Sequence, residues 1–169
     1  IIATLCCIIA LQAVFIFEKY KVQKTNELIV FNKNRNTAIT IRNGSKLILY
    51  ANDSIEKNYK TDWSLKSYSV ANFCEVKRVR TIQNFMYFKH KKIVIVGSTS
   101  LYLQKMQADI VILVNSPKIN LERFLKIVKP QQVVADGSNY TSYRELWKAT
   151  CAKQKILFHD TTEKGFYKL

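Results

Sequence analysis

The chain has 169 residues, enough for one domain of ordinary size with one hydrophobic core. Hydrophobic residues make up 48% of it and only four residues are glycine, a composition that excludes a disordered or collagen-like chain. Its 27 lysines and arginines outnumber 12 aspartates and glutamates, and the net charge of +15 predicts an anionic partner such as a phosphate backbone or anionic lipid. An AT-rich genome would also favour lysine codons, so the charge alone supports nucleic-acid contact without establishing it.

The cysteines exclude a disulfide framework. Cys6 and Cys7 are adjacent within an apolar run, which leaves Cys74 and Cys151 in the rest of the chain. At most one disulfide is then possible, and a four-cysteine zinc site is excluded. We interpret Cys74 and Cys151 as packing residues, because nothing in their surroundings marks either as a nucleophile of low pKa.

The two histidines do not form a metal-binding motif, because neither has another histidine at ligand spacing. His90 lies in a lysine-rich turn and is expected to be solvated. His159 precedes Asp160, and such a pair can bind a metal, although a histidine at a strand end is more often satisfied by solvent or backbone. No nucleophile elbow, Walker loop or dinucleotide-binding glycine motif occurs. We therefore expect no cofactor and no zinc or two-metal centre.

The N-terminal run, residues 1–17, contains no charge and no initiator methionine. At 1.5 Å per residue it spans about 25 Å, just short of a hydrocarbon core of about 30 Å. This predicts the C-terminal part of a transmembrane helix in a chain cut from a longer protein, followed by a juxtamembrane linker (18–26) and one domain (27–169). A signal peptide would begin with basic residues and end in a small-residue cleavage site, so it is disfavoured, while a buried helix stays an alternative.

The first part of the domain has the pattern of a β-meander. Apolar or alternating runs predict strands at Leu28–Phe31, Thr37–Ile41 and Lys46–Tyr50, with the hairpin signal Asn43-Gly44 before the third. A helix is expected over 54–73. Its N-terminus would be a capping box made by Asp53 and Glu56.

The second part changes from a hairpin to strand–helix alternation. Strands are expected at Asn84–Phe88, Lys92–Val96, Asp109–Val114, Gln132–Ala135, Ile156–Phe158 and Phe166–Lys168, with Gly165 at the turn before the last. One helix is expected at Leu121–Val128 before Pro130, and a second through Thr150, opened by a capping box of Ser142 and Glu145. The pattern predicts a sheet-rich α/β domain with helices packed on its sheets.

Basic residues alternate with aromatic or apolar ones at two places in the chain. Lys77, Arg78 and Arg80 surround two valines, and a second basic group adjoins Tyr87 and Phe88. This mixture is typical of a groove for a nucleic-acid strand, and a solvated charged face is the alternative. The candidate DNA-binding residues are Lys33, Arg35, Lys77, Arg78, Arg80, Lys89, Lys91, Lys92 and Lys118.

Several motifs share their order and spacing with a known family. They are Leu28–Phe31 with a following turn, Ala38–Ile41, Asn43-Gly44, Leu47–Leu49, Ala108–Leu113, Phe124-Leu125, Lys129-Pro130, Ser138-Asn139 and Glu163–Phe166. Together they resemble the C-terminal end of the ComEC family of competence membrane proteins. These proteins move transforming DNA through the bacterial inner membrane and carry a metallo-β-lactamase-like domain after their last transmembrane helices.

The resemblance implies a particular fold and location. The expected fold is α/β, a metallo-β-lactamase-like sheet sandwich with helices packed outside, preceded by a transmembrane helix end. The expected location is the bacterial inner membrane with the domain on the extracytoplasmic side. Lys19, Lys21 and Lys24 would favour a cytoplasmic domain by the positive-inside rule, but that rule is weak for one flank of one helix.

The chain departs from the family at the positions that bind metal. Residues 32–37 lack the acidic groups of the family's Asp-Val-Gly-Gln-Gly-Asp, no histidine occurs between Tyr50 and His90, and residues 115–118 replace its His-His-Gly-Ser. Asparagine, serine and lysine are poor ligands for divalent transition metals. The resemblance therefore implies a degenerate domain that has lost its metal site.

Three functions are compatible with these features. The first is a non-catalytic, DNA-contacting accessory domain of a ComEC-type DNA-uptake channel in natural transformation, with DNA, the membrane and other channel components as partners. The alternative is a metal-dependent nuclease or phosphoesterase with a site rebuilt from Asp109, Asp136, His159 and Asp160. A third is a surface that docks another channel component, with the basic charge serving anionic lipid.

Overall fold

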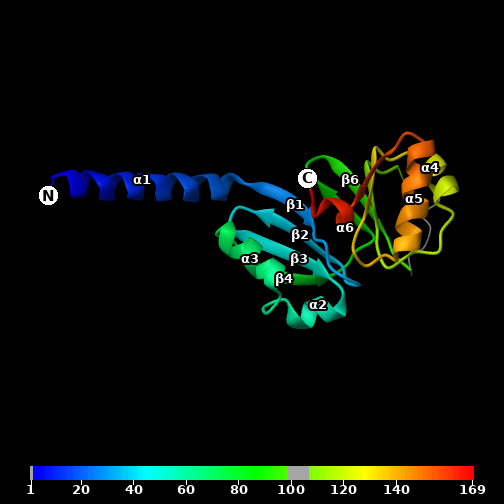
Figure 1. The fold of residues 1–169 in the computed structure, drawn as a ribbon, viewed down its shortest axis with the longest axis horizontal. Helices are drawn as coiled ribbons and strands as arrows, with labels where there is room; N and C mark the ends of the chain where they lie inside the picture. Colours follow the sequence, from blue (N-terminus) through cyan, green and yellow to red (C-terminus); the bar gives the residue numbers. More distant parts are fainter. Residues whose placement is uncertain (1, 99–106) are drawn as a thin grey trace.

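A computed structural model of the chain describes residues 2–98 and 107–169 and consists of one long helix joined to a two-sheet domain (Figure 1). The helix, α1 (Ile2–Lys24), extends away from the domain and has no buried residue. Among the described residues it is the one helix long and apolar enough to cross a membrane. The expected span begins at residue 1, which lies outside the described residues, and α1 continues through residues 18–24.

The first sheet, sheet A, has five strands in the spatial order β10, β1, β2, β3, β4. Their bounds are β1 (Asn26–Val30), β2 (Ala38–Asn43), β3 (Lys46–Ala51), β4 (Glu75–Thr81) and β10 (Tyr167–Lys168). The first three form an antiparallel meander through the Asn43-Gly44 turn. β4 is parallel to β3, because the chain crosses over the sheet through α2 (Asp53–Asn58) and α3 (Trp63–Ala71).

The second sheet, sheet B, has the order β5, β6, β7, β8, β9. Its strands are β5 (Phe85–Phe88), β6 (Lys91–Val96), β7 (Ile110–Leu113), β8 (Gln132–Ala135) and β9 (Leu157–Asp160). β5 and β6 form an antiparallel hairpin, and the other neighbours are parallel. The crossover helices are α4 (Leu121–Val128) and α5 (Thr141–Lys153), and α6 (Thr161–Lys164) connects β9 to β10.

The two sheets pack face to face around a shared apolar core that includes Leu28, Ile39, Ile93 and Ile112, all fully buried. Each sheet also buries its outer face under helices. Side chains of successive strand residues point to opposite faces, so near-continuous apolar strands supply both the inner and the outer core.

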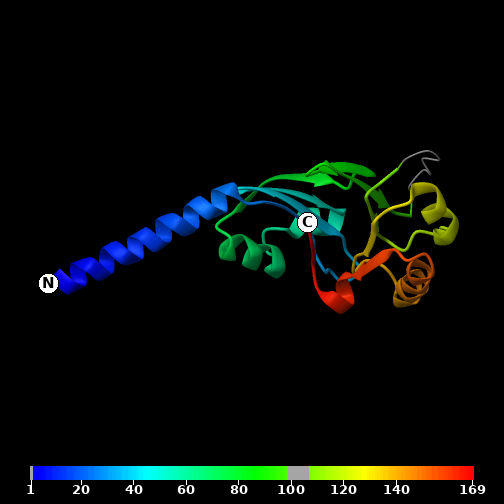
Figure 2. The ribbon, with the colours of Figure 1, turned by 90° about the horizontal axis from the view of Figure 1, so that it is seen from above.

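The outer cores are separate from the central one. On sheet A, Ile55 of α2 and Leu65 of α3 pack on the strands; on sheet B, Leu125 of α4 and Trp147 of α5 do so. The result is a four-layer helix–sheet–sheet–helix sandwich, seen in Figures 1 and 2 with α2 and α3 on one side and α4 and α5 on the other.

Most expected elements are confirmed, and so are the α/β class and the two sheets with helices packed outside. The helix over 121–128 begins after Asn120, whose side chain caps it by accepting from the Arg123 N–H at 3.0 Å. The helix is further stabilised because its apolar face is buried. It ends where Lys129 turns to φ +50° before Pro130. The metallo-β-lactamase-like part of the expectation stays a prediction.

Several local expectations are wrong. The single helix over 54–73 is two helices, and the side chain that caps the second is Asp62, which accepts from the Leu65 N–H at 3.0 Å. Asn52, not Asp53, is at the first N-cap. Neither α2 nor α5 has a side-chain hydrogen bond at its N-cap, so the two expected capping boxes do not form. Helix α6, which was not expected, lies between the last two strands, and Gly165 follows it with φ +79° in the turn before β10.

Candidate nucleic-acid interface and the polar edge opposite to it

The carboxyl ends of the parallel strands of sheet B carry a hydrogen-bonded polar cluster centred on Asp136, which follows β8. Thr37 Oγ1 donates to Asp136 Oδ2 at 2.6 Å, and Asn139 Nδ2 donates to Asp136 Oδ1 at 3.0 Å. The backbone N–H and the hydroxyl of Ser138 also donate to Asp136 Oδ1. We call this cluster, together with the loop after β7, the polar edge; its residues are Thr37, Asn115, Ser116, Asp136, Ser138 and Asn139.

The polar edge joins three segments that lie far apart in the chain. The Arg35 N–H donates to Gly137 O at 3.0 Å, and the Asn115 N–H donates to Ser138 Oγ at 2.7 Å. Gly137 leaves no room for a side chain, because a β-carbon there would lie 2.5 Å from Lys33 O. The segments in which the chain departs from the family motifs, 32–37 and 115–118, therefore meet at one edge of the sandwich.

Burial raises the pKa of Asp136 to about 7, against the opposing effect of hydrogen bonds from Ser138 and Thr37. The carboxylate is fully buried, and transfer out of water disfavours its charged form. Its donors are all protein groups, so both oxygens already have partners within the fold. This geometry stabilises the junction of the loops and leaves little free coordination for an ion.

The residues proposed for a rebuilt hydrolytic site do not converge. Asp109 precedes β7 and accepts from the Lys92 N–H at 2.8 Å, at the opposite end of the sheet from Asp136. Asp160 Oδ1 accepts from Arg144 at 3.1 Å and from the Thr162 N–H at 2.8 Å. His159 Nε2 lies 3.0 Å from Gly165 O, so the ordinary interpretation of this histidine is confirmed.

Metal ligands are not gathered anywhere in residues 2–98 and 107–169, where no group of three or more histidine, cysteine, aspartate or glutamate side chains could hold an ion. Cys74 and Cys151 are buried, and burial raises the pKa of both thiols. This agrees with their interpretation as packing residues.

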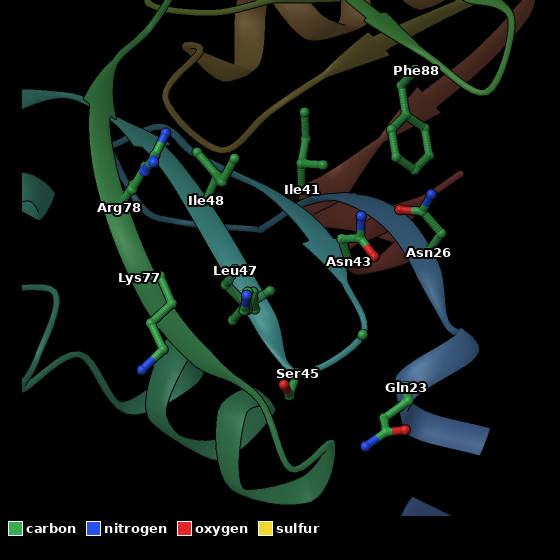
Figure 3. A pocket seen from close by; sticks show the side chains of 12 residues that line it. Gln23, Asn26, Ile41, Asn43, Ser45, Leu47, Ile48, Lys77, Arg78 and Phe88 are labelled. Carbon is green, nitrogen blue, oxygen red and sulfur yellow. The ribbon is translucent and has the colours of Figure 1, made fainter. Parts of the chain in front are cut away.

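An open groove of about 960 Å³ lies at the other end of the sandwich, where α1 joins the domain. Figure 3 shows it between the end of α1, the start of β3 and the start of β4. Three of its lining residues are basic and exposed: Lys46, Lys77 and Arg78. We call it the basic groove.

The basic groove is positioned by the register of two parallel strands. Ile48 of β3 lies directly opposite Arg78 of β4, and Figure 3 shows their side chains on the same side of the sheet as Ile41. Lys77 precedes Arg78 on β4, and Figure 3 shows its side chain pointing away from that of Arg78, because successive strand residues point to opposite faces. Phe88 of sheet B forms the opposite wall.

Acidic groups near the basic groove are few. Glu75 forms an ion pair with Lys77, and both side chains are more than half exposed. Gln23 and Asn26, which carry the chain from α1 into β1, line the groove with neutral polar groups. An anion approaching from solvent therefore meets basic side chains above an apolar floor.

The nine candidate DNA-binding residues do not form one surface. Lys77 and Arg78 line the basic groove, and Arg80 follows on β4 opposite Tyr50. Lys89 borders the groove, since its Nζ lies 5.5 Å from the centre of the Phe88 ring. Of these four, Lys77 and Arg78 line the groove itself.

The other five candidates lie elsewhere. Lys91 Nζ is 3.8 Å from Asp109 Oδ1 and donates to Gln131 Oε1, and Lys92 lines a pocket together with Asp109. Lys33 is mostly buried in an ion pair with Asp62. Arg35 and Lys118 are exposed in the loops of the polar edge, at the far end of the sandwich.

Sequence reasoning missed Lys46 as a groove residue. It stands at the start of β3, one residue after the Asn43-Gly44 turn, and lies opposite Glu75 of β4 in the strand register. The turn signal placed Lys46 at the start of a strand. Its neighbour on the adjacent strand, Glu75, lies 29 positions further on in β4, a strand that the sequence pattern does not predict. Gln23 and Asn26 were also missed, because they carry no charge.

The fold and the groove define a class of protein: an α/β sandwich module with a basic surface, attached to an apolar helix of transmembrane length. The family model described as the ComEC C-terminal domain matches residues 28–169, which is most of the chain. The chain therefore belongs to the ComEC family, a membrane protein family of competence and DNA uptake. Among curated proteins, no sequence matches this one.

Proposed function

We propose that the chain is a non-catalytic accessory domain of a ComEC-type DNA-uptake channel, which contacts DNA through the basic groove and is anchored in the membrane by α1. The observation that carries the proposal is the position of the groove: exposed Lys46, Lys77 and Arg78 lie where α1 enters the domain. DNA bound there would lie next to the membrane through which the family moves it.

The chemistry of the groove favours contact with the phosphate backbone. Lysine and arginine bind phosphates electrostatically and release condensed counterions, which makes binding independent of sequence and sensitive to salt. Phe88 lines the groove but is itself 6% exposed, so base stacking on it contributes little. A transporter of arbitrary sequences needs this kind of contact.

The polar edge supports a non-catalytic role. In a metallo-β-lactamase-like scaffold, as the resemblance implies, this edge would hold the metal ligands. Here Asp136 accepts hydrogen bonds from Thr37 and Asn139, and Asp160 accepts one from Arg144. We infer that this edge now stabilises the loops, and that the domain lies on the extracytoplasmic side of the bacterial inner membrane as the family resemblance implies.

Fluorescence anisotropy tests DNA contact by the basic groove. The full chain in detergent micelles is titrated into labelled single-stranded and duplex oligonucleotides over a range of salt concentrations. The slope of log K against log salt is expected to be about −0.9 per neutralised phosphate for duplex and about −0.7 for single strands. The triple variant Lys46→Gln, Lys77→Gln, Arg78→Gln removes up to three phosphate contacts. It should reduce the magnitude of that slope by about 2 to 3.

A matched control removes the same charge elsewhere. Lys57→Gln, Lys60→Gln and Lys153→Gln are all exposed, on or after α2 and at the end of α5. An equal loss in both triple variants, or an affinity independent of salt, contradicts the groove as the contact. Release of nucleotides from the labelled strands that stops on adding a chelator contradicts the non-catalytic role.

A further inference from the structure

The corner where α3 leads into β4 exposes two large apolar side chains. Val70 is 69% exposed in the last turn of α3, and Phe73 is 50% exposed in the loop that follows. Lys66 is also exposed, one helical turn before Val70 on the same face of α3. We call Lys66, Val70 and Phe73 the α3 corner.

The α3 corner touches the apolar part of α1. The rings of Phe15 and Phe73 pack edge to face, with centroids 6.2 Å apart. In both views the end of α3 that leads into β4 lies on the side of the domain from which α1 departs (Figures 1 and 2). One side chain of the domain therefore reaches back to the apolar part of α1.

The contact fixes the depth of Phe73 relative to the charge pattern of α1. Residues 2–17 carry no charge, and Glu18 and Lys19 are the first charged residues of the helix. With a rise of 1.5 Å per residue, Phe15 lies about 5 Å on the apolar side of Glu18. When α1 spans a bilayer, Phe73 is thus at the boundary between acyl chains and headgroups.

The attachment of α1 to the domain holds this arrangement. The Gly44 N–H donates to Thr25 O at 2.8 Å, and Thr25 Oγ1 donates to Lys21 O at 2.9 Å, so the hairpin turn is hydrogen-bonded to the residue that follows the helix. On the other side, Arg42 donates to the side chain and the backbone oxygen of Asn72, the neighbour of Phe73, at 2.9 and 3.0 Å. Both partners of the ring contact are anchored to sheet A.

The charges around the α3 corner favour anionic lipid. Glu18, Lys19, Lys21 and Lys24 follow the apolar run on α1, a net charge of +2, and exposed Lys66 adds a further cation on α3. Lys19 Nζ lies 4.9 Å from the centre of the Phe15 ring, so this cation lies next to the contact between Phe15 and Phe73. Phosphate groups at the membrane surface would neutralise such a cluster.

We propose that the α3 corner is seated in the membrane interface, with Val70 and Phe73 among the upper acyl chains and the lysines at the level of anionic headgroups. The proposal rests on the membrane span of α1 in the proposed function. A bilayer is the occupant that fits, because it supplies apolar and anionic chemistry at adjacent depths and α1 leads directly into it. A nucleic acid offers phosphate but nothing for two exposed apolar side chains.

Quenching of tryptophan by brominated acyl chains tests whether the α3 corner lies in the membrane interface. The full chain is inserted into vesicles of phosphatidylcholine with and without phosphatidylglycerol, with Phe73→Trp in a Trp63→Phe background. Trp147 is 1% exposed in the core of sheet B and serves as a constant signal that the quencher does not reach. The expected result is loss of the emission of the new tryptophan in vesicles that contain phosphatidylglycerol, with a smaller loss when this anionic lipid is left out.

Two matched variants separate the possible failures. Leu146→Trp, at a 62% exposed position on α5 across the sandwich, should show no quenching. Leu11→Trp, in the middle of α1, should be quenched in both kinds of vesicle. Quenching at position 11 but not at position 73 overturns the seat and leaves the span intact.

Other outcomes are equally decisive. Absence of quenching at position 11 overturns the span and the seat with it. Equal quenching at position 73 with and without phosphatidylglycerol overturns the anionic part of the proposal as stated. An unquenched, blue-shifted tryptophan at position 73 would mean that another protein surface, such as a second copy of the chain, covers the α3 corner, and it overturns the lipid seat.

Discussion

Asp136 is the residue at which burial and hydrogen bonding oppose each other most strongly. Burial raises the pKa of its carboxyl group from 3.8 to about 7, while four protein donors favour the charged form. A carboxyl group whose pKa is higher in the folded than in the unfolded chain stabilises the fold through its protonated form. This contribution is fully present below pH 3.8, the pKa of the group in the unfolded chain. That contribution is lost as the pH rises towards 7, because the unfolded chain then releases a proton that the folded chain keeps.

We predict that Asp136→Asn flattens the dependence of stability on pH. The amide keeps the shape of the protonated acid and can donate to Thr37 Oγ1, so the variant should lack the loss of stability between about pH 4 and pH 7. A shift of about three pKa units corresponds to at most about 4 kcal/mol. Urea unfolding of both proteins in detergent, monitored by the fluorescence of buried Trp147, measures the difference at each pH.

The control for Asp136→Asn is a carboxyl group outside the polar edge. Glu163 is exposed on α6 and pairs with Lys148, so Glu163→Gln should change stability by less than about 1 kcal/mol at any pH. Parallel curves for wild type and Asp136→Asn between pH 4 and pH 7 would contradict the raised pKa.

At the scale of elements, α3 is held to sheet A by a buried ionic network around Arg42. The guanidinium is 2% exposed on the outer face of β2 and donates to Glu27 at 3.0 Å. The hydroxyl group of Tyr68 and the side chain of Lys168 also bind Glu27, which connects α3, β1, β2 and β10. Burial alone would raise the pKa of Glu27, but its hydrogen bonds with Lys168, Tyr68 and Arg42 hold it below the ordinary value.

We predict that Arg42→Met destabilises the fold by about 3 kcal/mol, because it leaves Glu27 buried with fewer partners and frees Asn72. Hydrogen exchange of residues 66–74 should increase more than that of sheet B, because the contacts of Arg42 converge on α3. Urea unfolding with circular dichroism gives the free energy of unfolding. Arg78→Met, on the exposed edge strand β4, removes the same charge and should change stability by less than about 0.5 kcal/mol. Equal effects of the two substitutions would contradict the role of the network.

The elements that could be predicted are those with a local signal. The apolar periodicity of α4, the Asn43-Gly44 turn and the apolar runs of β6, β7 and β8 each specify an element within a few residues. β4 lacked such a signal: its sequence Glu75–Thr81 is mostly charged, and it is a strand because β3 pairs with it. The division between α2 and α3 was missed for a similar reason. Asp62 is the N-cap of α3, but the sequence around it gives no separate signal that a second helix begins at Trp63.

At the scale of the whole molecule, strand order decides which basic residues can act together. Lys77 and Lys33 are both basic and close to strands, but β4 begins beside α1 while the loop after β1 ends at the polar edge. The sequence contains the charges but not the order of the strands in two sheets, so it cannot show that the nine candidates divide between opposite ends. The polar edge was foreseeable in part, because the resemblance aligned its segments 32–37 and 115–118 with family motifs.

This division leads to a prediction about where DNA lies on the molecule. At the polar edge Lys33 is paired with Asp62, and two further aspartates, Asp136 and Asp160, stand at the ends of β8 and β9. Lys33 and Arg144 are thus held in ion pairs at this end, whereas Lys46, Lys77 and Arg78 all line the groove and are exposed. We therefore predict that the double variant Arg35→Gln, Lys118→Gln changes the salt slope of DNA binding by less than about 1, against about 2 to 3 for the groove triple variant.

The same anisotropy titration measures the double variant, with the groove variant as its reference. Because phosphate contacts contribute to the slope one by one, a slope that falls by about two units in the double variant would place DNA at the polar edge. DNA would then bind at the end of the sandwich farthest from α1, and the groove beside α1 would lose its proposed function. A small change in the double variant and a large one in the groove variant would instead mean that the charge near α1 determines where the strand is held.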